Sequence, residues 1–205
     1  MENGNGKDKK SALAMDRENG WNLLDGQELA LLEKYAADYM EFISTAKTER
    51  KAHDIAVALA EKCGFKNIEN CSGLKTGDRI YRSYRGRTLL LARIGKRPVS
   101  DGVNIVGGHI DAPRLDLKPN PLYEDSELAL LDTHYYGGIK KYQWVTIPLA
   151  MHGVVVRKDG TSVTIEIGEN LADPVLVITD LLPHLGQEQA KKTLSEAITG
   201  EGLNV

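Results

Sequence analysis

The stretch VNIVGGHIDAPR, residues 103–114, runs from apolar residues into two titratable side chains, His109 and Asp111. Its apolar beginning predicts a buried strand over residues 103–106. Two glycines follow, and they would let a ligand or another segment approach the backbone closely. Side chains two residues apart on an extended chain point the same way. His109 and Asp111 are therefore expected to face one site.

Helical patterns precede this stretch. Apolar residues recur at a spacing of three to four over residues 27–46 and again over 48–63, where Gly64 is expected to end the second helix. Residues 79–84 and 88–94 then flank a short glycine-containing loop, which predicts a hairpin. In open α/β sheets, ligands bind beyond the carboxyl ends of the strands. The polar pair lies at such a strand end.

The chain beyond Pro113 is rich in strand patterns. An Asp-Gly pair at positions 159 and 160, between two apolar runs, is a strong hairpin signal. A helix is predicted over residues 187–199. The predicted strands of this part cover residues 115–118, 128–132, 144–157, 162–167 and 175–178.

These patterns divide the chain into three parts. Residues 1–26 are polar and predict an extended arm. Residues 27–113 predict the first part of an α/β domain, and residues 114–205 predict a β-rich domain. The last predicted helix would lie at the end of an unfinished sheet. We therefore expect the chain to be the N-terminal portion of a longer protein.

Composition excludes several classes of protein. The chain has 205 residues, of which 41% are hydrophobic and 27% charged, as in globular domains. Its net charge of -3 gives no basic face for nucleic acid. No apolar run is long enough to span a membrane, and the N-terminus lacks the apolar region of a secretory signal. Cys63 and Cys71 do not form a CxxC motif, so we expect free thiols in the reducing cytoplasm.

The chemistry of the His-x-Asp pair suggests a metal. Imidazole is a good zinc ligand, and a carboxylate beside it can fix its tautomer and raise its basicity. The alternative is a loop histidine that is hydrogen-bonded to a turn. A metal site needs three or four ligands, and the spacing of residues in the sequence identifies no second ligand beside His109.

Longer stretches carry a family resemblance. GGHIDAPRLDLKPNPLYED, THYYGGIKKYQW, IPLAMHGVVVRKDG and ITDLLPHL together resemble the aminopeptidase I/aspartyl aminopeptidase family of zinc metallopeptidases. The resemblance runs from about Gln27 to the end of the chain. Residues 142–146, YQWVT, differ from the Trp-Phe-Asp-Arg-Asp stretch of the aspartyl branch, and Ala112 replaces a frequent serine. The chain is thus more similar to the aminopeptidase I branch.

The resemblance implies a fold and an activity. The fold would be a doubly wound α/β zinc-exopeptidase domain, followed here by a β-rich oligomerisation domain, in a homo-oligomer that is a dodecamer in the family. The activity would be removal of N-terminal residues from peptides by a water that two zinc ions activate, with cobalt or manganese as alternative metals. The physiological metal and the preferred N-terminal residue stay open.

The resemblance also implies roles for three residues. His109 would be a metal ligand, and Asp111 would be the carboxylate that orients it. His184, in the LLPHL segment, matches a histidine that the family places in the active site of a neighbouring subunit. The other metal ligands lie in the second half of family members, so the 205 residues alone are expected to be inactive.

Other interpretations are kept beside this one. The chain could belong to a related co-catalytic metallopeptidase or deacylase, or it could act as a non-catalytic oligomerisation module. Without the resemblance, His184 would be a structural residue at the entry to a helix. His152 is expected to be a histidine in the core or at an interface with its hydrogen bonds satisfied, and His53 is expected to be exposed on its helix.

Overall fold

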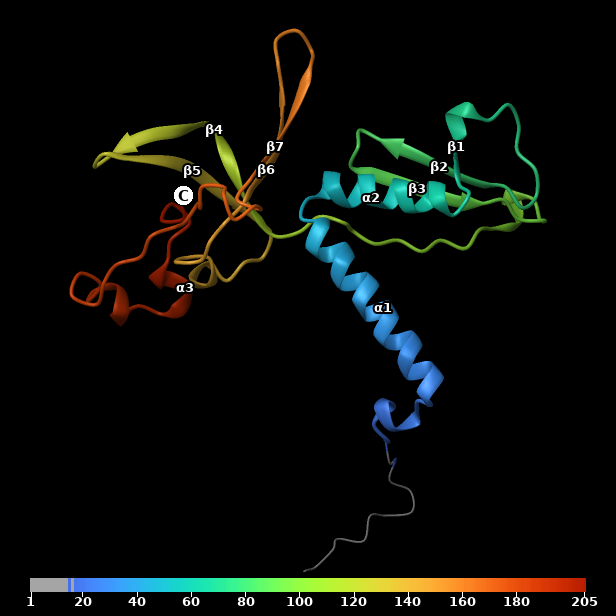
Figure 1. Cartoon of the computed structure of the whole chain (residues 1–205), viewed down its shortest axis with the longest axis horizontal. Coiled ribbons are helices and arrows are strands. Elements are labelled where there is room, and N and C mark those ends of the chain that lie inside the picture. The colour runs from blue at the N-terminus through green and yellow to red at the C-terminus, as the bar shows by residue number, and fades with distance from the viewer. Residues whose placement is uncertain (1–14, 16) are drawn as a thin grey trace, which may run out of the picture. The chain divides into compact units, whose positions relative to one another are not determined.

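A computed structural model of the chain describes residue 15 and residues 17–205. The chain divides into two units between Thr45 and Ala46. The first unit holds a short 3-10 helix and then α1 (Gly26–Thr45), which confirms the first predicted helix (Figure 1). The carboxylate of Asp25 accepts hydrogen bonds from two amides of the first turn, and Glu28 accepts one from the Asp25 amide at 3.0 Å. Most of the arm predicted over residues 1–26 lies outside the described residues.

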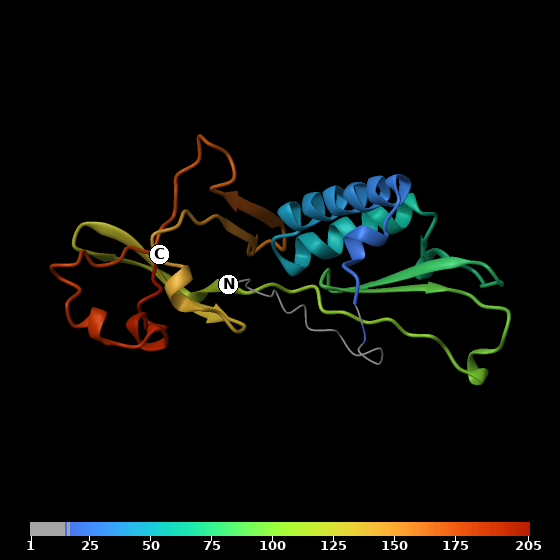
Figure 2. The ribbon, with the colours of Figure 1, turned by 90° about the horizontal axis from the view of Figure 1, so that it is seen from below.

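The second unit begins with α2 (Glu49–Lys62), which confirms the second predicted helix. Thr48 caps it by accepting a hydrogen bond from the Lys51 amide at 3.3 Å. The helix lies on one face of a three-stranded sheet (Figure 2). The strand order is β1 (Lys66–Asn67), β2 (Arg79–Tyr84) and β3 (Thr88–Arg93), with β1 parallel to β2 and β2 antiparallel to β3.

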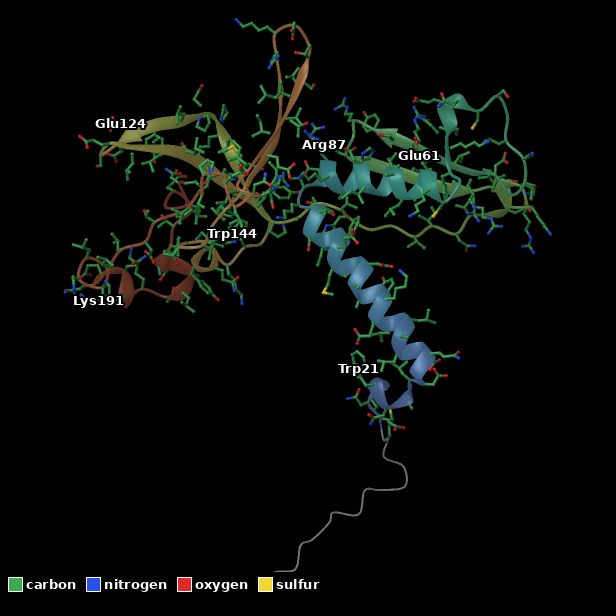
Figure 3. All side chains as sticks on the ribbon, in the orientation of Figure 1. Trp21, Glu61, Arg87, Glu124, Trp144 and Lys191 are labelled. Carbon is green, nitrogen blue, oxygen red and sulfur yellow. The ribbon has the colours of Figure 1, made fainter. Side chains whose placement is uncertain are left out.

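Hydrogen bonds fasten α2 to this sheet. The Tyr81 hydroxyl donates to Glu61 at 2.6 Å, and Arg79 donates to the Cys63 carbonyl at 2.7 Å (Figure 3 labels Glu61). His53 was expected to be exposed, and this prediction is wrong: its exposed fraction is 5%. It lies on the inner face of α2, where its Nε2 is 2.8 Å from the Ser83 hydroxyl oxygen. Burial is tolerated because both ring nitrogens have hydrogen-bond partners.

The remainder of the second unit is β-rich. An antiparallel pair forms from β4 (Arg114–Asp125) and β5 (Leu128–Tyr136), and β4 extends well beyond the predicted residues 115–118. A second antiparallel pair forms from β6 (Met151–Val156) and β7 (Ser162–Ile167), which confirms the hairpin predicted at the Asp-Gly turn.

The β-rich part has a small hydrophobic core of its own. Ile178, Ile198 and Leu203 are its buried centre. Val205 pairs with Leu131 through two backbone hydrogen bonds of 2.7 and 3.0 Å, so the last residues extend the β4–β5 sheet. Further residues pack partly buried against this centre, among them Leu115, Ile139, Val145, Leu149 and Trp144, of which Figure 3 labels Trp144.

The strand predicted over residues 103–106 does not form. This segment is extended and follows the sheet without a hydrogen-bonded partner among the described residues (Figure 1). Val106 is fully exposed, and Ile105 is 83% exposed. A β-strand is defined by its hydrogen bonds to a neighbouring strand, so an apolar pattern alone is not enough to form one.

Two other predicted strands are shorter than expected. Residues 144–157 form a strand only from Met151, because Thr146 has a positive φ of 61° and Pro148 lacks a backbone N–H. Residues 175–178 contribute a single bridge, between Leu176 and Leu149.

The helix predicted over residues 187–199 is also wrong in extent. It is replaced by a 3-10 turn at Gln189–Lys191 and one turn of α3 (Leu194–Ala197). The hydroxyl of Thr193 donates to Glu196 at 2.8 Å, which competes with a continuous helix at this point. Ile198 is drawn into the core in an extended conformation. Tertiary burial thus overrides the helical pattern.

The fold is mixed α/β, as predicted, and is built from small sheets. None of its helices within the described residues has the length and apolar character that crossing a membrane requires.

Candidate metal centre

His109 and Asp111 lie on the extended segment that leads from the sheet of β1–β3 into β4. The two side chains meet as expected, with His109 Nδ1 2.8 Å from Asp111 Oδ1. His109 is 89% exposed, whereas Asp111 is 33% exposed. When Nδ1 donates to the carboxylate, Nε2 keeps its lone pair. This is the arrangement in which a histidine ligates a metal.

The second carboxylate oxygen of Asp111 is also bound. The hydroxyl of Tyr136, at the end of β5, donates to Asp111 Oδ2 at 2.6 Å. This bond, and then the bond from His109, hold the pKa of Asp111 below its ordinary value. The same contact raises the pKa of Tyr136, because ionisation would place two negative oxygens side by side. Asp111 is thus an ionised acceptor with two donors.

Tyr136 is itself held in place by Arg114. The guanidinium carbon lies 4.1 Å from the centre of the tyrosine ring, within the range of a cation–π interaction. Arg114 donates from Nε to Asp116 at 2.7 Å, and its Nη1 is 3.7 Å from Glu49 at the start of α2. The chain His109–Asp111–Tyr136–Arg114 therefore connects the candidate ligand to both parts of the second unit.

The described residues supply one candidate metal ligand, His109, and do not form a complete metal site. No group of three metal-ligating side chains comes together among them. His109, with its carboxylate partner, has the chemistry of a zinc ligand. A four-coordinate zinc site would need further donors beside it.

His184 is not part of this cluster. It is exposed and lies in a turn. The turn is closed by two hydrogen bonds, which the amides of Leu185 and Gly186 donate to the Leu182 carbonyl, both at 2.9 Å. Within the part of the chain that the structure describes, no hydrogen bond or ion pair joins it to His109 or Asp111.

A groove of about 870 Å³ begins at the cluster: Arg114 lines it, whereas His109, Asp111 and Tyr136 do not. It is lined by the start of α2, the start of β4 and the base of the β6–β7 hairpin. At its wall, Glu169 accepts hydrogen bonds from Lys47 and from His152 Nε2, each at 2.7 Å. His152 is largely buried there, which confirms its predicted burial. The prediction that its hydrogen bonds are satisfied is wrong, because its Nδ1 has no partner within the described residues.

Comparison with known proteins decides the family. Residues 42–203 match the model of the aminopeptidase I zinc metalloprotease (M18) family. The chain belongs to the M18 family. A probable M18 family aminopeptidase 1 from Clostridium acetobutylicum is 49% identical over 197 residues, and the match covers 94% of this chain and 42% of that protein. The corresponding protein of Thermotoga maritima is 44% identical over 191 residues, with 93% and 41% covered.

Solved M18 structures are similar as well. The M18-family aminopeptidase of Thermotoga maritima superposes with a TM-score of 0.84 at 43% identity, over 93% of this chain and 41% of that one. Aminopeptidase I of Clostridium acetobutylicum gives a TM-score of 0.82 at 45% identity, over 94% and 43%. The M18 chain described here thus spans about two fifths of the length of these relatives.

Sequence reasoning found two members of the cluster and missed the others. His109 and Asp111 could be named because they are two residues apart. Tyr136 lies in the THYYGGIKKYQW stretch, which the sequence related only to the family, and no role was predicted for Arg114. The available signal for Tyr136 was the Tyr-Tyr-Gly-Gly stretch, but its contact with Asp111 depends on the register of β4 and β5.

Proposed function

We propose that this M18 chain is part of a zinc-dependent aminopeptidase that removes N-terminal residues from peptides. The observation that carries the proposal is the His109–Asp111 pair, in which one nitrogen is bound to a carboxylate and the other is free for a metal. His109 would be the ligand and Asp111 the carboxylate that orients it. Zinc, when bound, lowers the pKa of a coordinated water and polarises the peptide carbonyl.

The finer parts of the proposal rest on the family resemblance. Two ions would share the complete centre, in a doubly wound peptidase domain to which a β-rich oligomerisation domain is attached. With His109 as the single ligand identified, we propose that residues 1–205 tested alone are inactive. The absence of a three-residue ligand group among the described residues favours this. The free thiols of Cys63 and Cys71 are compatible with the cytoplasmic location we propose.

A chimera tests the activity. The 197 residues of the Clostridium acetobutylicum relative that match this chain would be replaced by the chain itself. We expect the chimera to hydrolyse aminoacyl-nitroanilides, to lose this activity with a chelator and to regain it with zinc. The unmodified relative is the positive control. A chimera that assembles like the relative but releases no product would count against the proposed activity. Activity of the isolated chain would contradict the proposal that residues 1–205 alone are inactive.

Self-association is the second proposal, and an exposed apolar ribbon supports it. Val154, Val155 and Val156 on β6 are 42%, 51% and 67% exposed. Two-stranded ribbons are marginally stable alone, and exposed apolar strands tend to pair with other chains. We propose that the β-rich part associates with further copies. Light scattering of the chain should give a mass above 22.5 kDa. Val155→Lys should lower that mass, whereas Leu194→Lys, at an exposed position of α3, should not.

His184 would act across the assembly, as a hydrogen-bond donor at the substrate carbonyl of a neighbouring subunit. Its exposed position in a turn is compatible with this role. Chimeras that carry His109→Ala or His184→Ala should each be nearly inactive. Their co-assembled mixture should regain part of the activity, because some sites then combine an intact His109 with an intact His184. A mixture that stays inactive would place both residues in the same subunit's site.

A further inference from the structure

Asp111 uses both carboxylate oxygens, and each bond goes to a different part of the fold. Oδ1 accepts from His109, its neighbour on the extended segment, at 2.8 Å. Oδ2 accepts from Tyr136, which is 25 residues away at the end of β5, at 2.6 Å. His109 is 89% exposed, and its side chain has no other hydrogen bond within the described residues. Its orientation therefore depends on Asp111, and that of Asp111 depends on Tyr136.

The position of Tyr136 is set by strand pairing. Tyr136 and Arg114 are directly opposite in the antiparallel register of β4 and β5. The guanidinium group stacks on the ring at 4.1 Å and is fixed by Asp116 at 2.7 Å. Arg114 follows Asp111 closely in the chain, with only Ala112 and Pro113 between them. The first pair of the ladder therefore brings the tyrosine hydroxyl to the carboxylate without a long, flexible connection.

We propose that Tyr136 is a positioning residue for the metal ligand His109. Its hydroxyl holds the Asp111 carboxylate, and the carboxylate holds His109 as the Nδ1–H tautomer with Nε2 free. The metal-binding part of this role rests on the proposed function, whereas the tautomer does not. Through Tyr136, the β-rich part of the chain controls the state of a ligand on the α/β part.

The chemistry behind the proposal is tautomer selection. A neutral imidazole carries one proton, and the hydrogen bond made by one nitrogen decides which nitrogen is free. A carboxylate that can rotate loses its geometry with respect to Nδ1, and the proton can then move to Nε2. An Nε2 that carries a proton cannot ligate. Partners behind metal-ligating histidines commonly contribute about 10–100-fold to metal affinity.

The test is nitrogen NMR of the metal-free chain of 205 residues. Long-range proton–nitrogen correlations report which ring nitrogen of His109 is protonated. In the wild-type chain we expect the Nδ1–H tautomer. Tyr136→Phe keeps the ring that stacks on Arg114 but removes the hydroxyl, and it should shift the population towards Nε2–H. Tyr135→Phe is the matched control, because Tyr135 stacks on His134 and has no bond to Asp111 within the described residues.

The outcomes separate the two proposals. If Tyr136→Phe leaves the His109 tautomer as in the wild type, the positioning role is overturned, whatever the chain binds. The zinc affinity of the chimera, measured against a competing chelator, tests the next step. If the tautomer shifts but this affinity is the same with and without the Tyr136→Phe change, the link from tautomer to metal is overturned. A tautomer shift with no zinc binding by either form would count against the proposed function alone.

A second readout needs no variant. In the wild-type chain, the ring protons of Tyr136 should show a through-space contact with the β-protons of Asp111. The hydroxyl proton of Tyr136 should exchange with solvent more slowly than that of Tyr135. The absence of the ring contact would overturn the proposal even if Tyr136→Phe failed to fold.

Discussion

Arg114 and Tyr136 face each other at the first pair of the β4–β5 ladder, with the guanidinium carbon 4.1 Å from the ring centre. This contact joins a strand that begins directly after the His-x-Asp segment to a strand that returns from a distant turn. It is the point at which the β-rich part of the chain reaches the candidate ligand.

We predict that Arg114→Met destabilises the chain by about 1–2 kcal/mol, because a partly buried cation–π contact and a charged hydrogen bond to Asp116 are both lost. Urea unfolding would measure this. Arg85→Met is the control, since Arg85 lies over the more exposed ring of Tyr84 at 5.2 Å. Equal effects of the two changes would contradict a special role for Arg114.

His53→Ala should be more costly. The change leaves a cavity under α2 and removes the partner of the Ser83 hydroxyl, so we expect a loss of about 2–3 kcal/mol. His184→Ala, at an exposed turn, should change stability by less than about 0.5 kcal/mol. The same urea titration compares both variants. A small effect at His53 would mean that α2 is held to the sheet by other contacts.

The stability of the chain should fall in acid through Glu169. Its hydrogen bonds, that of Lys47 first and that of His152 next, hold the pKa of Glu169 below its ordinary value of 4.5. Because the pKa is lower in the folded state, the ionised carboxylate stabilises the fold above pH 4.5. That contribution is lost as the pH falls from 4.5 through the lowered pKa. Glu169→Gln should therefore flatten the acid part of a plot of unfolding free energy against pH, and an unchanged slope would contradict this.

Metal removal should have no effect on the isolated chain. The described residues bring no three ligating side chains together, so we expect zinc to play no structural part in this fold. Thermal unfolding with and without a strong chelator should give the same midpoint. A midpoint that drops with the chelator would show that these residues hold a metal by themselves.

Local patterns predicted the elements that depend on nearby residues. The helices α1 and α2 follow from apolar spacing with caps at Asp25 and Thr48, and the β6–β7 hairpin follows from its Asp-Gly turn. The predictions for residues 103–106 and 187–199 were wrong, because the conformations of these segments depend on contacts with distant residues. Residues 103–106 have no strand beside them among the described residues. Residues 187–199 do not form a continuous helix, because Ile198 is buried in the core in an extended conformation.

The same division applies to the candidate site. The pairing of His109 with Asp111 is local and could be read from the sequence. The contact between Asp111 and Tyr136 spans 25 residues and depends on the β4–β5 register, which contains an irregularity between Leu117 and Leu122. No spacing rule gives such a register in advance.

The zinc content of the chimera with and without His109 is the most direct test of the central claim, that His109 ligates the catalytic metal. We predict that His109→Ala lowers bound zinc and reduces hydrolysis at least about 100-fold, while His134→Ala retains both. A His109→Ala chimera that keeps its full zinc content and its activity would contradict the claim.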